Sequence, residues 1–137
     1  MSRVIFASHG GLSKGMKDSV SMIVGDLAKD VETYSLLPGQ NPEDFYQELS
    51  KQAKESDEQI LDLCDIKGGS VHTALSKLAV LDNVMVFSGM NMGLALDAVM
   101  KSLGGEVSLE DATDLINAAK EGMTVMNGMS SEEDEDF

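Results

Sequence analysis

Short apolar runs alternate along this chain with longer segments in which apolar residues recur every three or four positions. Short runs bounded by glycine, proline, asparagine and aspartate are typical of strands, and continuous ones are typical of strands covered on both faces. Strands are therefore predicted at residues 4–7, 31–37, 60–64 and 84–87. The three- and four-residue spacing between and after them predicts amphipathic helices.

The first predicted helix covers about residues 13–28 and follows Gly10 and Gly11. Its apolar stripe consists of Leu12, Met16, Val20, Ile23, Val24 and Leu27. The next helix begins after Asn41, a residue type favoured at the N-cap, and Pro42 suits its first helical position. Phe45, Leu49 and Ala53 are its predicted buried stripe.

Three more helices are predicted in the second half of the chain. One is capped by Ser70, one covers residues 94–103 and stops at Gly104, and one starts at Ser108 and ends at Gly122. Ser108 and Asp111 have the spacing of a capping box. Strands that alternate with helices predict an α/β fold, a doubly wound and mainly parallel four-stranded sheet with helices on both faces.

The end of the chain carries two different patterns. Residues 123–126 form a short apolar segment, which we interpret as an antiparallel edge strand. Residues 130–137 are acidic and polar, which predicts a disordered tail. The predicted domain is therefore 1–129, followed by the tail 130–137.

Composition narrows the function. The chain has 137 residues and a formal net charge of −14, and its ten Lys and Arg residues are scattered singly. Nucleic acid is a poor partner for such a surface, whereas a basic protein would suit it.

No apolar run approaches the roughly 18 residues of a spanning helix, and no secretory signal precedes the first strand, so we expect a cytoplasmic protein. The lone Cys64 lies in an apolar strand and is predicted to be a buried, inert thiol.

The candidate chemistry lies where three predicted strands end. His9, the run from Asp65 to Ser70, and the run from Ser88 to Asn91 follow the first, third and fourth strands. In a parallel sheet these loops meet at the carboxyl edge, where ligands bind. A carboxylate such as Asp65 on one ring nitrogen of His9 would fix the tautomer and leave the other nitrogen as a nucleophile.

Backbone N–H groups near this histidine suggest what it attacks. Gly68 and Gly69 before a capped helix could bind an incoming phosphoryl group. The chain has no lysine-containing phosphate loop, so a nucleotide is disfavoured. Gly68 and Gly69 are therefore candidate phosphate-binding residues.

At these residues the chain resembles a known family, the mannose-type enzyme IIA domain of the bacterial sugar phosphotransferase system. The resemblance rests on an ordered set of motifs: Ser8-His9-Gly10, Leu37-Pro38-Gly39 with Asn41, Asp65 to Ser70 with Ala74, and Gly89-Met90-Asn91. It covers about residues 3–103.

The resemblance implies a phosphotransferase in which His9 carries the phosphoryl group and Asp65 is its partner, with Ser70 beside the phosphate. Such domains accept the phosphoryl group from the carrier protein HPr and pass it to an enzyme IIB domain, which phosphorylates the incoming sugar; the membrane permease is involved only indirectly. They use neither metal nor nucleotide. With the resemblance, the predicted phosphate-binding set is Gly10, Gly68, Gly69 and Ser70, with no metal and no cofactor. The resemblance also implies a homodimer in which a C-terminal antiparallel strand crosses to the other subunit. Residues 123–126 are the candidate for that strand.

Two alternative functions remain open. The chain could instead be the phosphocarrier subunit of a dihydroxyacetone kinase, or a regulatory module that senses phosphorylation without passing the group on.

Where the family commonly has proline after Gly-Gly-Ser, this chain has Val71 and His72. We interpret His72 as an exposed helix residue; the other interpretation is that it orients the phosphate or a partner.

Overall fold

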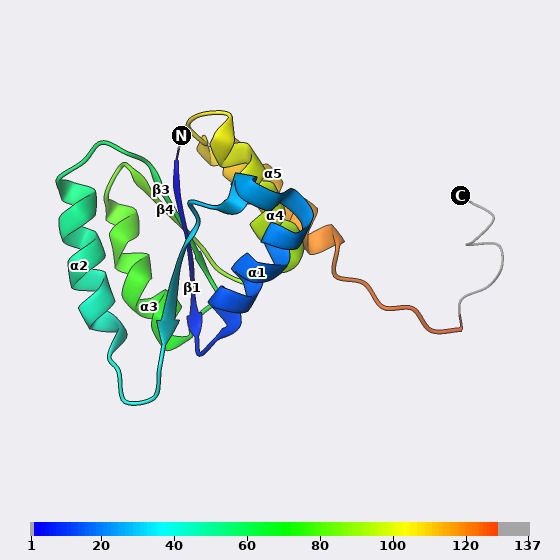
Figure 1. Cartoon of the computed structure of the whole chain (residues 1–137), viewed down its shortest axis with the longest axis horizontal. Coiled ribbons are helices and arrows are strands. Elements are labelled where there is room, and N and C mark those ends of the chain that lie inside the picture. The colour runs from blue at the N-terminus through cyan, green and yellow to red at the C-terminus, as the bar shows by residue number, and fades with distance from the viewer. Residues whose placement is uncertain (1, 129–137) are drawn as a thin grey trace.

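Four parallel strands form one sheet in the order β2-β1-β3-β4 in the computed structural model, which describes residues 2–128 (Figure 1). The strands are β1 (Arg3–His9), β2 (Glu32–Leu36), β3 (Ile60–Cys64) and β4 (Val84–Phe87). All four lie where the sequence predicted strands. The acidic tail 130–137 lies outside the described residues, so its predicted disorder stays a prediction.

Helices cover both faces of this sheet (Figure 1). The α-helices are α1 (Leu12–Val24), α2 (Pro42–Lys54), α3 (Ser70–Leu75), α4 (Met92–Leu103) and α5 (Leu109–Glu121), and 3-10 turns η1 (Gly25–Ala28) and η2 (Ser76–Val80) extend α1 and α3. One face packs on α2 and α3, and the other on α1, α4 and α5. The predicted doubly wound α/β class is therefore confirmed, with a wholly parallel sheet.

The predicted antiparallel edge strand is absent from the single chain. Residues 123–126 have no strand pairing and are exposed, and the chain leads away from the sheet after α5 (Figure 1). Strand β4 therefore keeps an unpaired edge among the described residues. Exchange with a second copy remains a prediction, since only one chain is present.

The first helix departs from its predicted apolar stripe. Met16 and Val20 are buried, but Leu12, Ile23 and Leu27 are 51%, 62% and 50% exposed. Ser13 is fully buried in their place, because its hydroxyl donates to the carbonyl of Tyr34 at 2.9 Å and so can leave water.

Helix termini follow the predicted caps with one exception. Asn41 accepts from the N–H of Glu43, and Ser108 and Asp111 form the predicted capping box. Ser70 is not a cap: Gly69 occupies the N-cap position and Ser70 is the first residue of α3. The Ser70 hydroxyl is thereby free for a contact outside its own helix.

Asp62 is an unusual residue in the middle of β3. It is fully buried, and neither carboxyl oxygen has a hydrogen-bond partner among residues 2–128. It lies beside Ile5 of β1 and Val86 of β4, on the face that α2 and α3 cover. Burial raises the pKa of Asp62 from 3.8 to about 7, because the charged form cannot be solvated there.

This burial predicts a pH-dependent stability. The folded state holds a proton on Asp62 that the unfolded chain loses above about pH 4, so the free energy of unfolding should fall as pH rises from 4 through 7. Asp62→Asn should remove this decline and leave the variant more stable at pH 8, by on the order of 3 kcal/mol. Urea unfolding at several pH values measures it, with Asp57→Asn on the exposed surface as control. A decline of equal size in Asp62→Asn would contradict the assignment.

Candidate functional site

His9 and Asp65 meet at the carboxyl edge of the sheet, as the sequence predicted. His9 ends β1, and Asp65 follows β3 directly; the two strands are parallel neighbours, with Ala7 opposite Cys64. Nδ1 of His9 lies 2.7 Å from Oδ2 of Asp65, and the backbone N–H of His9 donates to the same oxygen at 2.8 Å. The His9 side chain is 46% exposed and that of Asp65 only 8%.

Three hydrogen bonds keep Asp65 ionised. Besides the two from His9, Oδ1 accepts the N–H of Ile66 at 2.9 Å. Burial alone would raise the pKa of Asp65, but the backbone and ring hydrogen bonds from His9 and that from Ile66 outweigh it and lower the pKa. An ionised carboxylate only accepts, so Nδ1 of His9 carries a proton, and in the neutral ring Nε2 then keeps its lone pair.

Ser70 lies against this second nitrogen. Its Oγ is 3.0 Å from Nε2 of His9, and in the neutral ring its hydroxyl donates to this nitrogen. The histidine is thus held from both sides, yet its ring remains partly open to solvent. Such a nitrogen can attack an electrophilic phosphorus once the weakly held hydroxyl turns aside.

The predicted phosphate-binding glycines already use their N–H groups inside the protein. Gly10 donates to the carbonyl of Leu36 at 2.8 Å, Gly68 to Nδ1 of His72 at 3.0 Å, and Gly69 to the carbonyl of Ile66 at 3.2 Å. Contact between these groups and a phosphate would require local rearrangement. Their role in phosphate binding therefore stays a prediction.

Gly69 has a steric role beside His9. A Cβ at this position would lie 2.7 Å from Cγ2 of Ile66 and 3.2 Å from Cε1 of His9. Only glycine lets the backbone approach the ring this closely.

Two buried serines, Ser8 and Ser13, hold the turn that follows His9. The sequence analysis assigned them no role in the site. Oγ of Ser8 accepts the N–H of Ser13 at 2.7 Å, and Oγ of Ser13 lies 3.1 Å from that of Ser35. These bonds fix the turn between β1 and α1, directly after His9. The signal was present, since Ser8 continues an apolar strand where a polar side chain needs a partner.

The loop after β4 takes a different part in the site. Met90 is buried and donates its N–H to the carbonyl of Cys64, while Asn91 caps α4 by accepting from Leu94. The loop thus fixes the end of β3, next to Asp65. Cys64 is buried as predicted, and burial raises the pKa of its thiol.

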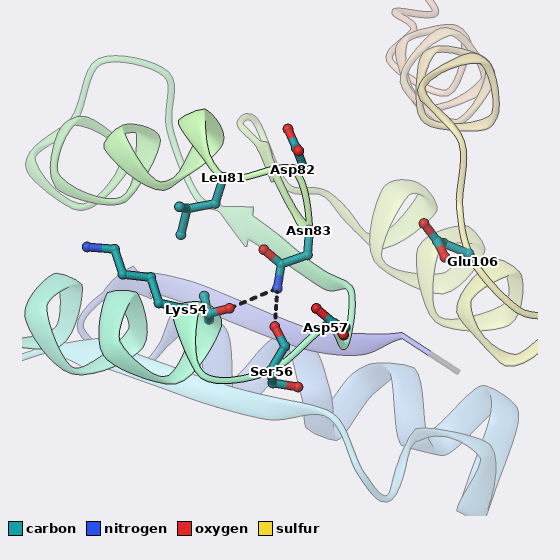
Figure 2. A pocket seen from close by; sticks show the side chains of 8 residues that line it. Lys54, Ser56, Asp57, Leu81, Asp82, Asn83 and Glu106 are labelled. Atoms are coloured by element: carbon teal, nitrogen blue, oxygen red, sulfur yellow. Dashed lines mark hydrogen bonds between the residues drawn. The ribbon is translucent and has the colours of Figure 1, made fainter.

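A pocket of about 460 Å³ lies at the opposite, amino edge of the sheet (Figure 2). Asn83 fixes its wall by donating to the carbonyls of Ala53 and Ser56. Its carboxylates, from Asp57, Asp82 and Glu106, contact neither His9 nor Asp65. The pocket and the His9–Asp65 pair therefore lie at opposite edges of the sheet.

Two kinds of feature are absent from residues 2–128. No group of three or more His, Cys, Asp or Glu side chains in this range has a geometry that could hold a metal ion. No helix in the same range is both long and apolar enough to cross a membrane.

Known proteins with similar sequences show the class of protein to which this chain belongs. Residues 3–119 match the EIIA-man family model, described as the fructose IIA component of the phosphotransferase system. The chain is 34% identical over 101 residues to the sorbose-specific EIIA component of the phosphotransferase system of Klebsiella pneumoniae, covering 72% of this chain and 73% of that protein. The protein is thus a component of a sugar-transporting phosphotransferase system. It belongs to the EIIA-man family, the mannose type of IIA component, as its motifs suggested.

Solved structures share the fold. The mannose/sorbose-specific IIA subunit from Enterococcus faecalis superposes with a TM-score of 0.79 at 24% identity, covering 94% of this chain and 97% of that one. Component EIIA from Streptococcus agalactiae superposes with a TM-score of 0.78 at 26% identity, covering 91% and 97%.

The close packing of the Gly69 backbone against His9 can be tested by substitution. Gly69→Ala should displace the His9 ring or Ile66, because the new Cβ would lie 2.7 Å from Cγ2 of Ile66 and 3.2 Å from Cε1 of His9. The Nδ1–H resonance of His9 in NMR spectra should shift or broaden. Gly93→Ala is the control, since its nearest atom would lie at an ordinary 3.5 Å. An unchanged resonance in Gly69→Ala would show that the contact does not position the ring.

Proposed function

We propose that this chain is a phosphocarrier which accepts a phosphoryl group from phosphorylated HPr on Nε2 of His9 and passes it to an enzyme IIB domain. The observation that carries this proposal is the 2.7 Å bond between Nδ1 of His9 and Oδ2 of Asp65. It leaves the lone pair of Nε2 directed away from the carboxylate. Membership of the EIIA-man family supports the same role.

The proposed step needs no group beyond those on the two proteins. The lone pair of Nε2 attacks phosphorus, the N–P bond to His9 forms, and the bond to the donor histidine breaks with its electron pair returning to that nitrogen. His9 keeps its proton on Nδ1, so its ring becomes positive. The ionised Asp65 stabilises that charge, and the Ser70 hydroxyl can turn to donate to a phosphoryl oxygen. Transfer to the IIB domain is the reverse of this step with a new acceptor.

Exposed apolar side chains near His9 favour a protein donor. Leu12, Leu37 and Ile66 are 51%, 49% and 58% exposed, and each lies within three residues of the carboxyl end of a strand. Apolar side chains grouped around an open reactive group are typical of protein docking sites. The strongly acidic chain would also attract a basic partner.

The histidine assignment has a direct test. His9→Ala should abolish phosphorylation by phospho-HPr while the fold is retained, because the ring is partly exposed and contributes little packing. Acid-labile labelling from radioactive phosphoenolpyruvate measures it. The matched control is His72→Ala, which removes the other histidine and should still label to one phosphate per chain. Full labelling of His9→Ala would overturn the proposal.

The role of the carboxylate is tested separately. Asp65→Ala should reduce the rate of transfer at saturating phospho-HPr by at least tenfold, because the tautomer is no longer fixed and the charged ring is no longer stabilised. The half-saturating concentration should change little. An unchanged rate would mean that Asp65 serves only the turn after β3.

A supporting transfer assay separates the carrier from the alternatives. Phosphorylated protein should give up its phosphoryl group to a IIB domain of the mannose type. A regulatory module would retain it, and a dihydroxyacetone kinase subunit would deliver it to the kinase instead.

We further propose that the chain forms a homodimer by strand exchange. A groove of about 670 Å³ runs beside the free edge of β4, lined by β4, by α5 and by Lys67 and Ala79. Met123, Val125 and Met126 are 75%, 89% and 68% exposed. If this segment pairs with β4 of a second copy, it covers that edge and buries its own apolar side chains, and the exchange closes with two-fold symmetry.

Truncation distinguishes this assembly from others. A chain ending at Gly122 should be monomeric or aggregate, whereas a chain ending at Gly128 should remain a dimer, because only the second keeps the segment 123–126. Sedimentation velocity measures both. A stable dimer in both cases, or a soluble monomer in both, would exclude strand exchange through this segment.

A further inference from the structure

His72 holds the loop that carries Ser70. It lies in the first turn of α3 and is half-buried, and its Nδ1 accepts the N–H of Gly68 at 3.0 Å. On the other side of the same glycine, the hydroxyl of Thr73 donates to the carbonyl of Gly68 at 3.3 Å. Both backbone polar groups of Gly68 are therefore bonded to side chains of α3.

Gly68 is the residue at which this loop turns back toward His9. Its φ of 79° lies in the left-handed region, and only six residues, Asp65 to Ser70, make up the loop and its turn. The conformation of Gly68 consequently decides where Gly69 and Ser70 lie against the His9 ring. Those contacts, at Cε1 and at Nε2, add to the Asp65 bond at Nδ1 in holding the ring.

We propose that His72 is a positioning residue for phosphoryl transfer through His9. By accepting the Gly68 N–H it keeps the loop in the conformation that places the Ser70 hydroxyl at Nε2. This inference rests on the proposed phosphocarrier function and adds a residue to it. The hydrogen bond of His72 goes to Gly68, whereas the two ring nitrogens of His9 are bonded to Asp65 and Ser70, so the proposed effect of His72 runs through the loop.

The bond requires a particular state of the His72 ring. Nδ1 must present a lone pair to the Gly68 N–H, so the ring is neutral with its proton on Nε2. A side chain that offers an acceptor at the position of Nδ1 should replace it, and one of the same shape without an acceptor should not. Asparagine is the first kind, because its Oδ1 is as many bonds from Cα as Nδ1 is, and phenylalanine is the second.

The experiment compares these two substitutions by single-turnover transfer from phospho-HPr at increasing concentration. His72→Phe should lower the saturating rate roughly three- to tenfold, the range that corresponds to one hydrogen bond, with little change in the half-saturating concentration. His72→Asn should stay within about twofold of the natural protein. A residue needed only for folding would instead show equal effects of both substitutions, tracking their thermal midpoints.

The route through Ser70 is tested in a double-mutant cycle. If His72 acts by placing the Ser70 hydroxyl, His72→Phe should cause no further loss of rate in a Ser70→Ala background. A direct measurement on the natural protein keeps the inference falsifiable if His72→Phe does not fold: NMR should show a coupling through the hydrogen bond between the Gly68 amide nitrogen and Nδ1 of His72.

Several outcomes would overturn the inference. These are an unchanged rate in His72→Phe, equal slowing in His72→Asn, full additivity with Ser70→Ala, or absence of the coupling. They differ from failure of the proposed function, in which phospho-HPr would not label His9 in the natural protein at all.

Discussion

The site depends on one carboxylate oxygen that binds the same histidine twice. Oδ2 of Asp65 accepts both the backbone N–H and the ring Nδ1 of His9, so the end of β1 and the imidazole are fixed by a single partner. That arrangement is possible only because β1 and β3 are parallel neighbours that end at the same edge. Since the carboxylate stays ionised, it also determines which ring nitrogen can react.

The supports around this pair belong to the same edge of the sheet. Ser8 and Ser13 fix the turn after β1, Met90 fixes the end of β3 through the carbonyl of Cys64, and His72 holds the loop that brings Ser70 to Nε2. None of these residues needs to contact a phosphoryl group to affect it. They restrict the positions of His9 and Ser70, which would reduce the reorganisation needed during the proposed phosphoryl transfer.

Much of the fold could be predicted because the central strands are buried on both faces and their apolar runs are nearly continuous, as in residues 60–64. The first helix was harder: Ile23 has the right spacing but stays exposed, since packing on the sheet and α4 uses Met16 and Val20 instead. That His9 and Asp65 lie close together could be predicted from the ends of their strands. The contacts of Ser70 and His72 could not, because they depend on the left-handed turn at Gly68 rather than on any periodicity.

The most direct test of this account is to determine which atom carries the phosphoryl group. The protein, labelled with ¹⁵N at histidine, would be incubated with phospho-HPr and studied by NMR for coupling between ³¹P and the ring nitrogens. The account predicts a single phosphohistidine, with the coupling at Nε2 of His9 and Nδ1 still protonated against Asp65. Phosphate on Nδ1 of His9, or on His72, would contradict it.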